Sequence, residues 1–338
     1  MENTIERFFT DEAERVLSEV PKGDFTFALV TDSHLSDTRD QTCANIRYMD
    51  DKLHYRCLLH LGDFLCGSIP DIASRRLLRE ELAAYRSAVA NGKLYVAQGN
   101  HDGYCDENYR DGIYGQHDMA IDEIWYEATK FMDESPNMVR PDVKPYFYVD
   151  FSEEKLRFIV LCSMWYRLNR DYRVYRKIYG LSREQIDWMA REALCVPGEG
   201  WNVIVFSHIT GMPRTSSSWL SGGKEVIDLL NAFRNGGSVL IDDVSYKFEY
   251  ANHNVLAWCA GDGHGDMTQK WEGINFTCTA SQLPTVPVTW EQPRGYFPAP
   301  RVIGAASQDA WDTITWVKSE RKLVFTRFGA GENRTIYY

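Results

Sequence analysis

The sequence predicts an α/β fold in which helices cover a sheet that contains parallel strands. Three apolar runs of strand type, Phe25–Val30, Cys57–Leu61 and Lys93–Gln98, each lead into a polar loop, and helical segments lie between them. This order of elements is typical of successive βαβ units. The 338-residue chain has 44% hydrophobic and 25% charged residues, as globular proteins do, and no linker divides it. We therefore expect a single domain over residues 1–338.

Helices are expected where apolar spacing and composition favour them. Val16 and Val20 stand four residues apart among carboxylates and predict a short acidic helix over Thr10–Val20. Further helices are expected over residues 42–53, 72–89, 119–132, 182–194 and 224–233. The segment 72–89 is rich in Ala, Leu, Arg and Glu, which are good helix formers. Ser182 and Gln185 have the spacing of a capping box at the start of the helix over 182–194.

The remaining strands complete the α/β pattern. They are expected at residues 146–151, 156–162, 201–206, 255–259, 274–279, 313–317 and 323–328. A proline-rich loop region over residues 281–310 precedes the last two of them.

One segment, residues 165–179, combines basic and aromatic side chains. Tyrosines lie among its basic residues, which are Arg167, Arg170, Arg173, Arg176 and Lys177. One interpretation is a solvated hairpin or helix face. The other is an insert that covers the site, contacts substrate phosphates and stacks on an aromatic or nucleoside group. The sequence leaves both interpretations open.

Charge, cysteine spacing and apolar runs disfavour several classes of protein. The formal net charge of −11 argues against extended binding along a nucleic-acid backbone. No apolar run reaches the length of a membrane span, and the N-terminus lacks the basic and apolar regions of a signal peptide. The eight cysteines are scattered without a CxxC pair, so we expect reduced thiols in a cytoplasmic protein and no zinc–thiolate site.

Polar, chemically able side chains follow five of the expected strands. These are Asp32 and His34, Asp63, Asn100 and His101, His208, and Asp262 and His264. Open α/β sheets bind their ligands at the carboxyl ends of strands. Oxygen and imidazole donors without cysteine suit divalent manganese, iron or zinc, and two such ions can clamp a phosphate and activate a water as hydroxide. We therefore expect two divalent metal ions and a small phosphorylated substrate.

The stretch Gly99–Asp102 divides the expected chemistry among neighbouring residues. Taken alone it could be an ordinary turn. Beside a metal centre, His101 is suited to protonate the leaving oxygen, and Asp102 is suited to orient the imidazole. Asp63 stands alone after its strand, as a carboxylate that bridges two ions would. His60, in the strand before it, is interpreted as a packed residue rather than a ligand.

Taken in order, these clusters resemble the motifs of the calcineurin-like metallophosphoesterase superfamily. The family pattern is D-x-H, then G-D, then G-N-H-D/E, then a histidine that ends a strand. It is matched by Asp32-Ser33-His34, Gly62-Asp63, Gly99-Asn100-His101-Asp102 and His208. The resemblance implies a four-layer α/β/β/α sandwich of two mixed sheets flanked by helices.

The resemblance also implies a role for each residue. Asp32, His34 and Asp63 would hold the first metal, Asn100 and His208 the second with Asp63 as the bridge, and His101 would be the catalytic acid.

The last motif of the family, G-H-x-H, is altered in this chain. In one alignment Gly261-Asp262-Gly263-His264 is the motif and Asp262 replaces its first histidine. In the other, Gly263-His264-Gly265-Asp266 is the motif and Asp266 replaces its second. We favour the first, because Gly261 follows its strand after one small residue and Asp266 then matches an aspartate of relatives with G-H-x-H-x-D. Asp262 would join the second metal and His264 the first, which predicts a harder second site.

These features together predict a metal-dependent phosphoric ester hydrolase with a dinuclear metal centre and metal-bound hydroxide. It would act as a phosphomonoesterase or a phosphodiesterase. A nuclease of the same superfamily is one alternative, which the net charge of −11 disfavours. A degenerate binding or scaffold protein is another. The replacement at Asp262 supports that alternative, whereas the presence of Asn100 and His101 argues against it.

Overall fold

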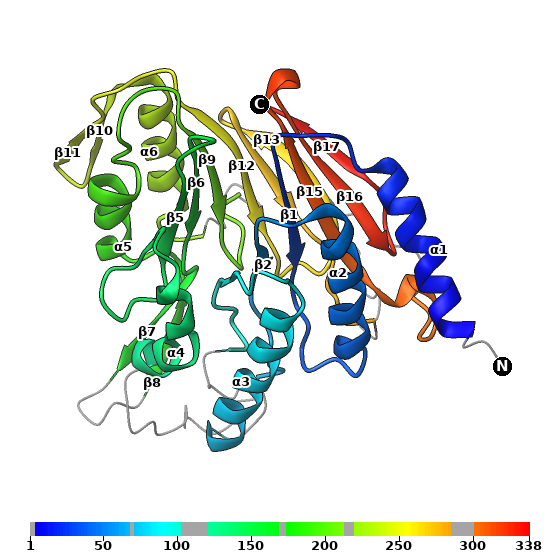
Figure 1. Cartoon of the computed structure of the whole chain (residues 1–338). Coiled ribbons are helices and arrows are strands. Elements are labelled where there is room, and N and C mark those ends of the chain that lie inside the picture. The colour runs from blue at the N-terminus through cyan, green and yellow to red at the C-terminus, as the bar shows by residue number, and fades with distance from the viewer. Residues whose placement is uncertain (1–3, 68–70, 103–120, 169–173, 213–219, 285–300) are drawn as a thin grey trace.

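Two large mixed β-sheets stand face to face, and helices cover their outer faces (Figure 1). The computed structural model describes residues 4–67, 71–102, 121–168, 174–212, 220–284 and 301–338. The order of layers is helix, sheet, sheet, helix. This arrangement confirms the expected four-layer α/β/β/α sandwich.

The first sheet contains the three parallel strands that the sequence predicts. Its strands are β1 Phe25–Val30, β2 Leu58–His60, β3 Leu94–Val96, β15 Ala310–Val317, β16 Lys322–Gly329 and β17 Arg334–Tyr337. They lie in the order β17-β16-β15-β1-β2-β3. β1, β2 and β3 are parallel, whereas β15, β16 and β17 join them antiparallel. The carboxyl ends of β1 to β3 therefore meet at one edge of the sheet.

The second sheet has a parallel centre and antiparallel flanks. Its strands are β4 Met138–Val139, β5 Phe147–Phe151, β6 Leu156–Val160, β9 Asn202–Phe206, β12 Asn254–Ala260, β13 Met267–Trp271 and β14 Ile274–Cys278. They lie in the order β13-β14-β12-β9-β6-β5-β4. β6, β9, β12 and β14 are parallel to their neighbours in this order, so their carboxyl ends also share one edge.

The helices lie close to the expected positions. They are α1 Thr4–Glu19, α2 Arg39–Leu53, α3 Asp71–Ser87, α4 Ile121–Thr129, α5 Arg183–Trp188 and α6 Gly223–Asn235. The helix expected over 119–132 changes to a 3₁₀ turn at Lys130–Glu134, and the one expected over 182–194 changes to a π turn at Met189–Ala193. None of the helices in the described ranges combines the length and apolar character needed to cross a bilayer.

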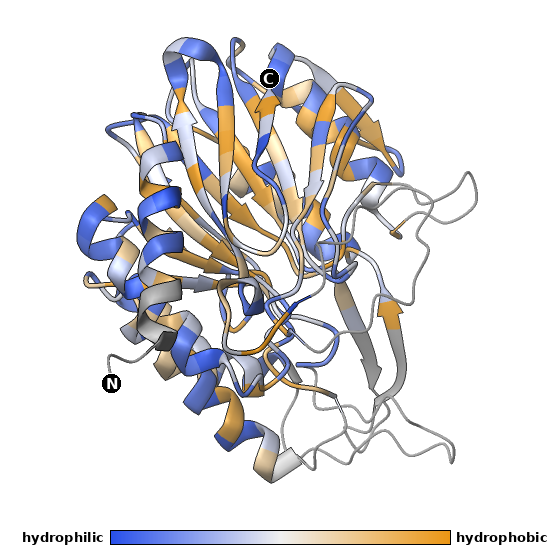
Figure 2. Ribbon diagram, turned by 90° about the vertical axis from the view of Figure 1, so that its right-hand side faces the viewer, coloured by the Kyte–Doolittle hydropathy of each residue, from blue (hydrophilic) through white to orange (hydrophobic). Residues whose placement is uncertain are grey.

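Alternating side chains of the central strands join the layers into two cores. Phe158 of β6 and Phe206 of β9 lie in the cluster that fills the space between the sheets and extends to α1–α3. Ile159 and Val205, one position away, lie in the cluster under α5 and α6. Because side chains of a strand alternate between its faces, both faces of the second sheet are covered. The apolar residues accordingly concentrate on the strands inside the molecule (Figure 2).

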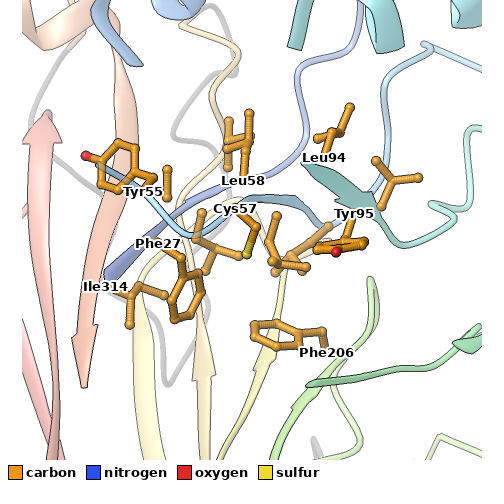
Figure 3. Packing of buried hydrophobic residues seen from close by; sticks show 14 of the residues in the cluster. Phe27, Tyr55, Cys57, Leu58, Leu94, Tyr95, Phe206 and Ile314 are labelled. Atoms are coloured by element: carbon orange, nitrogen blue, oxygen red, sulfur yellow. The ribbon is translucent and has the colours of Figure 1, made fainter. Parts of the chain in front are cut away.

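Aromatic rings from both sheets meet in the central core. The ring of Phe27 on β1 lies 4.9 Å from that of Phe158 and 6.1 Å from that of Phe206. Figure 3 shows Phe27 and Phe206 among the aliphatic side chains of the first sheet. Each such tilted or edge-to-face pair contributes about 0.5–1.5 kcal/mol beyond its buried area. The contacts fix one sheet on the other and hence the spacing of their carboxyl ends.

Two hairpins and one edge strand extend this frame. The insert over 165–179 contains β7 Met164–Leu168 and β8 Val174–Tyr179, which pair antiparallel. Its backbone is therefore a hairpin and not a helix, and residues 169–173 lie outside the described part. The second hairpin, β10 Ser238–Ile241 with β11 Val244–Lys247, and the edge strand β13 were not expected. β13 is largely exposed, whereas the second hairpin buries Ile241 and Tyr246 in the core cluster under α5 and α6.

The proline-rich region over 281–310 is described only at its two ends, because residues 285–300 lie outside the described ranges. Its ends are tied together by Arg301, whose guanidinium donates to the carbonyls of Ser281, Gln282 and Leu283. The amides of Gln282 and Leu283 in turn donate to the carbonyls of Thr31 and Asp32. This segment therefore supports the loop that follows β1.

The start of α5 differs from a full capping box. Ser182 Oγ accepts from the amide of Gln185 at 3.2 Å, as expected. The Gln185 side chain does not return to Ser182, because its amide group bonds the N–H and the C=O of Cys162 at 2.7 and 2.8 Å. We expect Ser182→Ala to lower the free energy of unfolding by about 1 kcal/mol, measured by denaturant unfolding. An unchanged stability would mean that water replaces this cap.

Candidate dinuclear metal centre

Five loops from the two sheets meet at one end of the sandwich. They follow β1, β2 and β3 of the first sheet and β9 and β12 of the second. They carry all the expected ligands, which are Asp32, His34, Asp63, Asn100, His208, Asp262 and His264. The packing of the two sheets therefore brings together residues that are up to 232 positions apart, from Asp32 to His264.

The backbone of these loops is left-handed at most of the ligand positions. The φ angles are 54° at Asp32, 47° at His34, 56° at Asp63, 58° at Asp262 and 53° at His264. This region is uncommon for residues other than glycine, although aspartate tolerates it better than most. Each such residue costs about 1–2 kcal/mol. The fold stabilises this strain at the point where the ligand side chains must turn toward one another.

Two glycines allow the loops to pack against each other. A Cβ on Gly99 would lie 2.0 Å from the amide nitrogen of Asp63, and one on Gly261 would lie 2.6 Å from Asp32 Oδ2. Neither space can hold a methyl group. The glycines of the G-N-H-D and G-D-G-H stretches are therefore needed for contact between neighbouring ligand loops.

Four of the candidate ligands form a compact first set, which consists of Asp32, His34, Asp63 and His264. One ligand atom from each lies within 4.8 Å of the others. His264 Nε2 is 3.1 Å from Asp32 Oδ1 and 3.3 Å from His34 Nε2. His34 Nε2 is 3.7 Å from Asp63 Oδ2. Two imidazole nitrogens and two carboxylates thus converge on one point.

A second set surrounds the imidazole of His208 and consists of Asp63, Asn100, His208 and Asp262. His208 Nε2 lies 2.9 Å from Asn100 Oδ1, 3.2 Å from Asp63 Oδ2 and 3.9 Å from Asp262 Oδ1. Asp63 Oδ2 therefore faces both sets, while its Oδ1 accepts from the amide of His101 at 2.8 Å. This is the arrangement that a bridging carboxylate requires.

Backbone carbonyls fix the rings of two of these histidines. His34 Nδ1 lies 3.0 Å from the carbonyl oxygen of Leu65, and His208 Nδ1 lies 2.8 Å from that of Leu61. A carbonyl can only accept, so Nδ1 carries the proton in each ring. Nε2 of each ring therefore points toward the carboxylates and is left to bind a proton or a metal ion, as in metal-ligating histidines whose Nδ1–H bonds a carbonyl.

The surroundings of Asp32 suit a bound cation. Asp32 Oδ1 is buried and has no hydrogen-bond partner among the described residues, whereas Oδ2 accepts from Thr31 Oγ1 at 2.6 Å. Burial opposes ionisation of Asp32, but the imidazoles of His264 and His208 outweigh it and hold the pKa of the carboxyl well below its usual range. A buried, ionised oxygen that faces ring nitrogens is the environment that a divalent cation would complete.

The electrostatics at His208 lead to the same conclusion. Burial lowers the pKa of this imidazole, but the carboxylates of Asp63 and Asp32 raise it well above its usual value. The surrounding oxygens therefore strongly favour a positive charge at Nε2, which a proton or a metal ion can supply.

His101 lies at the solvent side of the centre. Its side chain is 27% exposed, and its Nε2 atom is 3.8 Å from Asp63 Oδ2. A Cβ on Gly67 would lie 2.5 Å from His101 Nδ1, so this glycine, with a φ of 74°, leaves room for the ring. His101 therefore presents Nε2 toward the centre.

Asp102 differs from the expectation that it orients the His101 imidazole. Its carboxylate is fully buried and accepts four backbone N–H groups, from Asp63 at 2.8 Å, Gly99 at 2.9 Å, Phe64 at 2.9 Å and Leu65 at 3.1 Å. Burial and the nearby Asp63 carboxylate raise the pKa of Asp102, and the backbone donors counteract this. Asp102 therefore holds the Asp63 loop against the Gly99 loop.

The two aspartates of the altered last motif have different surroundings. Asp262 faces His208, whereas Asp266 lies in a buried ionic network with Arg327 and Arg334 at 2.6 and 2.7 Å. The same two arginines bind Asp312 on β15 at 2.9 and 2.6 Å. The structure therefore places Asp262, and not Asp266, beside the metal-ligand sets.

Two backbone carbonyls and one glycine shape the site although the sequence did not point to them. The carbonyls of Leu61 and Leu65 orient two histidines, but a backbone carbonyl leaves no signal in a sequence. Gly67 stands five residues after Gly62 of the G-D motif, and this nearness to the motif was the signal for its role beside His101. His60 is buried, as interpreted: its Nδ1 accepts from the Gly62 amide at 3.2 Å, and its Nε2 lies 3.2 Å from Ser33 Oγ.

Comparisons with known proteins agree with this geometry. The sequence model of the calcineurin-like phosphoesterases matches residues 25–266. A dimetal phosphatase from Danio rerio has a similar structure, with 13% identity, 94% of this chain and 100% of that chain covered, and a TM-score of 0.56. A Plasmodium protein described as the anchor in the inner membrane complex is similar over 94% of this chain and 89% of that chain, with 9% identity and a TM-score of 0.50.

These two structural similarities, at low identity, concern the fold alone. No curated protein matches the chain significantly. The family match covers more than half of the chain and includes every residue from Asp32 to Asp266 discussed above. The chain therefore belongs to the calcineurin-like phosphoesterase family, whose members are hydrolases that act on ester bonds.

Proposed function

We propose that this protein hydrolyses a phosphoric ester of a small molecule, a monoester or a diester, with two divalent cations. The observation that supports the proposal most strongly is the position of Asp63 Oδ2. It lies 3.7 Å from His34 Nε2 of the first set and 3.2 Å from His208 Nε2 of the second. One carboxylate oxygen that faces two groups of ligands suits a dinuclear centre.

The chain's residues would hold two cations in the sets already defined. The first set is Asp32, His34, Asp63 and His264, and the second set is Asp63, Asn100, His208 and Asp262. When bound, two divalent cations supply an activated water and neutralise charge on the phosphate oxygens. Manganese, iron and zinc all fit nitrogen and oxygen donors. The carbonyls of Leu61 and Leu65 keep two of the rings aimed at the centre.

His101 would supply the proton that the leaving group needs. Its Nε2 faces the centre from the solvent side, whereas Gly67 packs against its Nδ1. A histidine in this position can hold a proton at Nε2 and release it to the ester oxygen as the P–O bond breaks. Asp102 contributes indirectly, because its bonds to the Asp63 and Gly99 amides fix the backbone that carries Asp63 and His101.

Two further features belong to this proposal. A cytoplasmic location is supported by the buried thiols of Cys43, Cys57, Cys162 and Cys259, which form no disulfide. For the β7–β8 hairpin, a role as a cover that contacts substrate phosphates is supported by its basic and aromatic sequence. Extended nucleic-acid binding, as a nuclease would need, fits poorly with the net charge of −11.

The test is hydrolysis of p-nitrophenyl phosphate and bis-p-nitrophenyl phosphate by the metal-loaded full chain. We expect turnover of at least one ester with added Mn²⁺, loss of turnover with a chelator, and recovery when metal is restored. The ratio of the two rates separates monoesterase from diesterase. No turnover of either ester with two metals bound per chain would favour a binding role, such as that of the Plasmodium anchor protein with a similar fold.

A further inference from the structure

We propose that Asp262 makes the two cation sites chemically unequal, so that the first retains zinc or iron while the second takes an exchangeable manganese or magnesium ion. The inference rests on the proposed function and concerns the metal that completes the centre. It follows from the donor atoms that the structure gathers around each position.

The donor atoms of the two sets differ. In the first set, the nitrogens of His34 and His264 join two carboxylates, so half of the protein donors are imidazole. In the second set, His208 supplies the single nitrogen. The other three donors are the oxygens of Asp63, Asn100 and Asp262. Imidazole suits zinc and iron, whereas carboxylate and amide oxygens suit magnesium and manganese.

The backbone of its loop holds Asp262 in place. Its backbone is left-handed, with a φ of 58°, and its N–H donates to Asp32 Oδ2 at 3.2 Å. Gly261, directly before it, packs so closely on Asp32 that a Cβ would lie 2.6 Å from Oδ2. The loop is thereby fastened to the first set, while the Asp262 carboxylate extends to 3.9 Å from His208 Nε2 in the second.

A carboxylate at position 262 changes charge as well as donor type. It adds a second negative charge near His208, to which Asp63 already contributes one, whereas a histidine would add a neutral ring. Binding of magnesium and manganese depends mainly on such anionic oxygen donors and on retained water. The second set is therefore shifted toward hard cations, and the first set, with its two imidazoles, is not.

The experiment measures metal binding directly. The metal-stripped full chain is incubated with two equivalents of Zn²⁺ and dialysed, and Mn²⁺ is then titrated while free Mn²⁺ is followed by electron paramagnetic resonance. Elemental analysis gives the zinc that remains. We expect the wild type to keep one zinc and to bind one Mn²⁺ per chain. The same titration with Mg²⁺ in competition should displace Mn²⁺ and leave the zinc in place.

Two variants test the role of Asp262. Asp262→His supplies a nitrogen donor, and we expect it to bind Mn²⁺ about tenfold or more weakly and to take up a second zinc. Asp262→Asn keeps an oxygen donor without the charge, so it should weaken Mn²⁺ binding without a gain in zinc binding. Histidine and asparagine both tolerate a left-handed backbone, and thermal unfolding verifies that each variant folds.

The outcomes separate this inference from the proposed function. Equal Mn²⁺ affinity in the wild type and both variants, or a wild type that takes two zinc ions in preference to one zinc and one Mn²⁺, would overturn the inference. Selective metal binding without ester hydrolysis would instead contradict the proposed function and leave the metal selectivity in place. If Asp262→His fails to fold, the wild-type competition and Asp262→Asn still decide.

Discussion

His101→Asn is expected to lower the turnover of an alkyl phosphate ester by about 10²- to 10⁴-fold, the range typical of a lost general acid. The imidazole lies at the solvent side of the centre, with Nε2 3.8 Å from Asp63 Oδ2. An alkoxide leaves poorly without a proton, whereas p-nitrophenolate leaves readily. The rate with p-nitrophenyl phosphate should therefore fall much less than the rate with the alkyl ester.

Metal content and a matched histidine variant control this result. His54 is exposed and has a left-handed backbone with a φ of 54°, which asparagine also accepts, so His54→Asn should leave both rates unchanged. Elemental analysis should find the same metal in His101→Asn as in the wild type. Loss of a metal, or an equal fall with both esters, would show that His101 acts as a ligand and not as the acid.

The strand–helix order could be predicted from sequence because its signal is local. Each of β1, β2, β3, β9 and β12 is a short apolar run that ends at a polar cluster, and parallel strands place such clusters at one edge. The composition of the loops therefore pointed to the candidate ligands, and the structure brings these side chains together. The exposed edge strand β13 gave no such signal, because its pairing with β14 and not burial defines it. The four-residue strands β10 and β11 each bury one apolar side chain, Ile241 and Tyr246, which is too few for a recognisable pattern.

The partners of individual side chains were not predictable. Gln185 has the spacing of a capping box, yet its amide group binds the backbone of Cys162, which comes 23 residues earlier. Asp262 and Asp266 both follow β12 in the sequence, and only the folded chain distinguishes them. Arg327 and Arg334 bind Asp266, whereas His208 faces Asp262. Such choices depend on the packing of distant strands, which a sequence pattern does not contain.

The partners of Asp102 were not predictable either, and they give its replacement a large expected effect on stability. Asp102→Asn is expected to lower the free energy of unfolding by about 3 kcal/mol or more, because an amide replaces an acceptor for buried N–H groups. One carboxylate oxygen serves Asp63 and Gly99, and the other serves Phe64 and Leu65. An asparagine can accept at one position only, and its NH₂ group would face two donors at the other. Denaturant unfolding measures the change.

A matched substitution separates this effect from the loss of a charge. Asp243 is exposed in the turn between β10 and β11 and has a φ of 63°, so Asp243→Asn should change stability by less than about 0.5 kcal/mol. If Asp102→Asn keeps full stability but loses the alkyl ester rate, as His101→Asn does, this prediction is wrong. That result would support the role that the sequence suggested, in which Asp102 orients the imidazole. Lower stability together with weaker metal binding is what its bonds to the Asp63 and Gly99 loops predict, since Asp63 lies in both ligand sets.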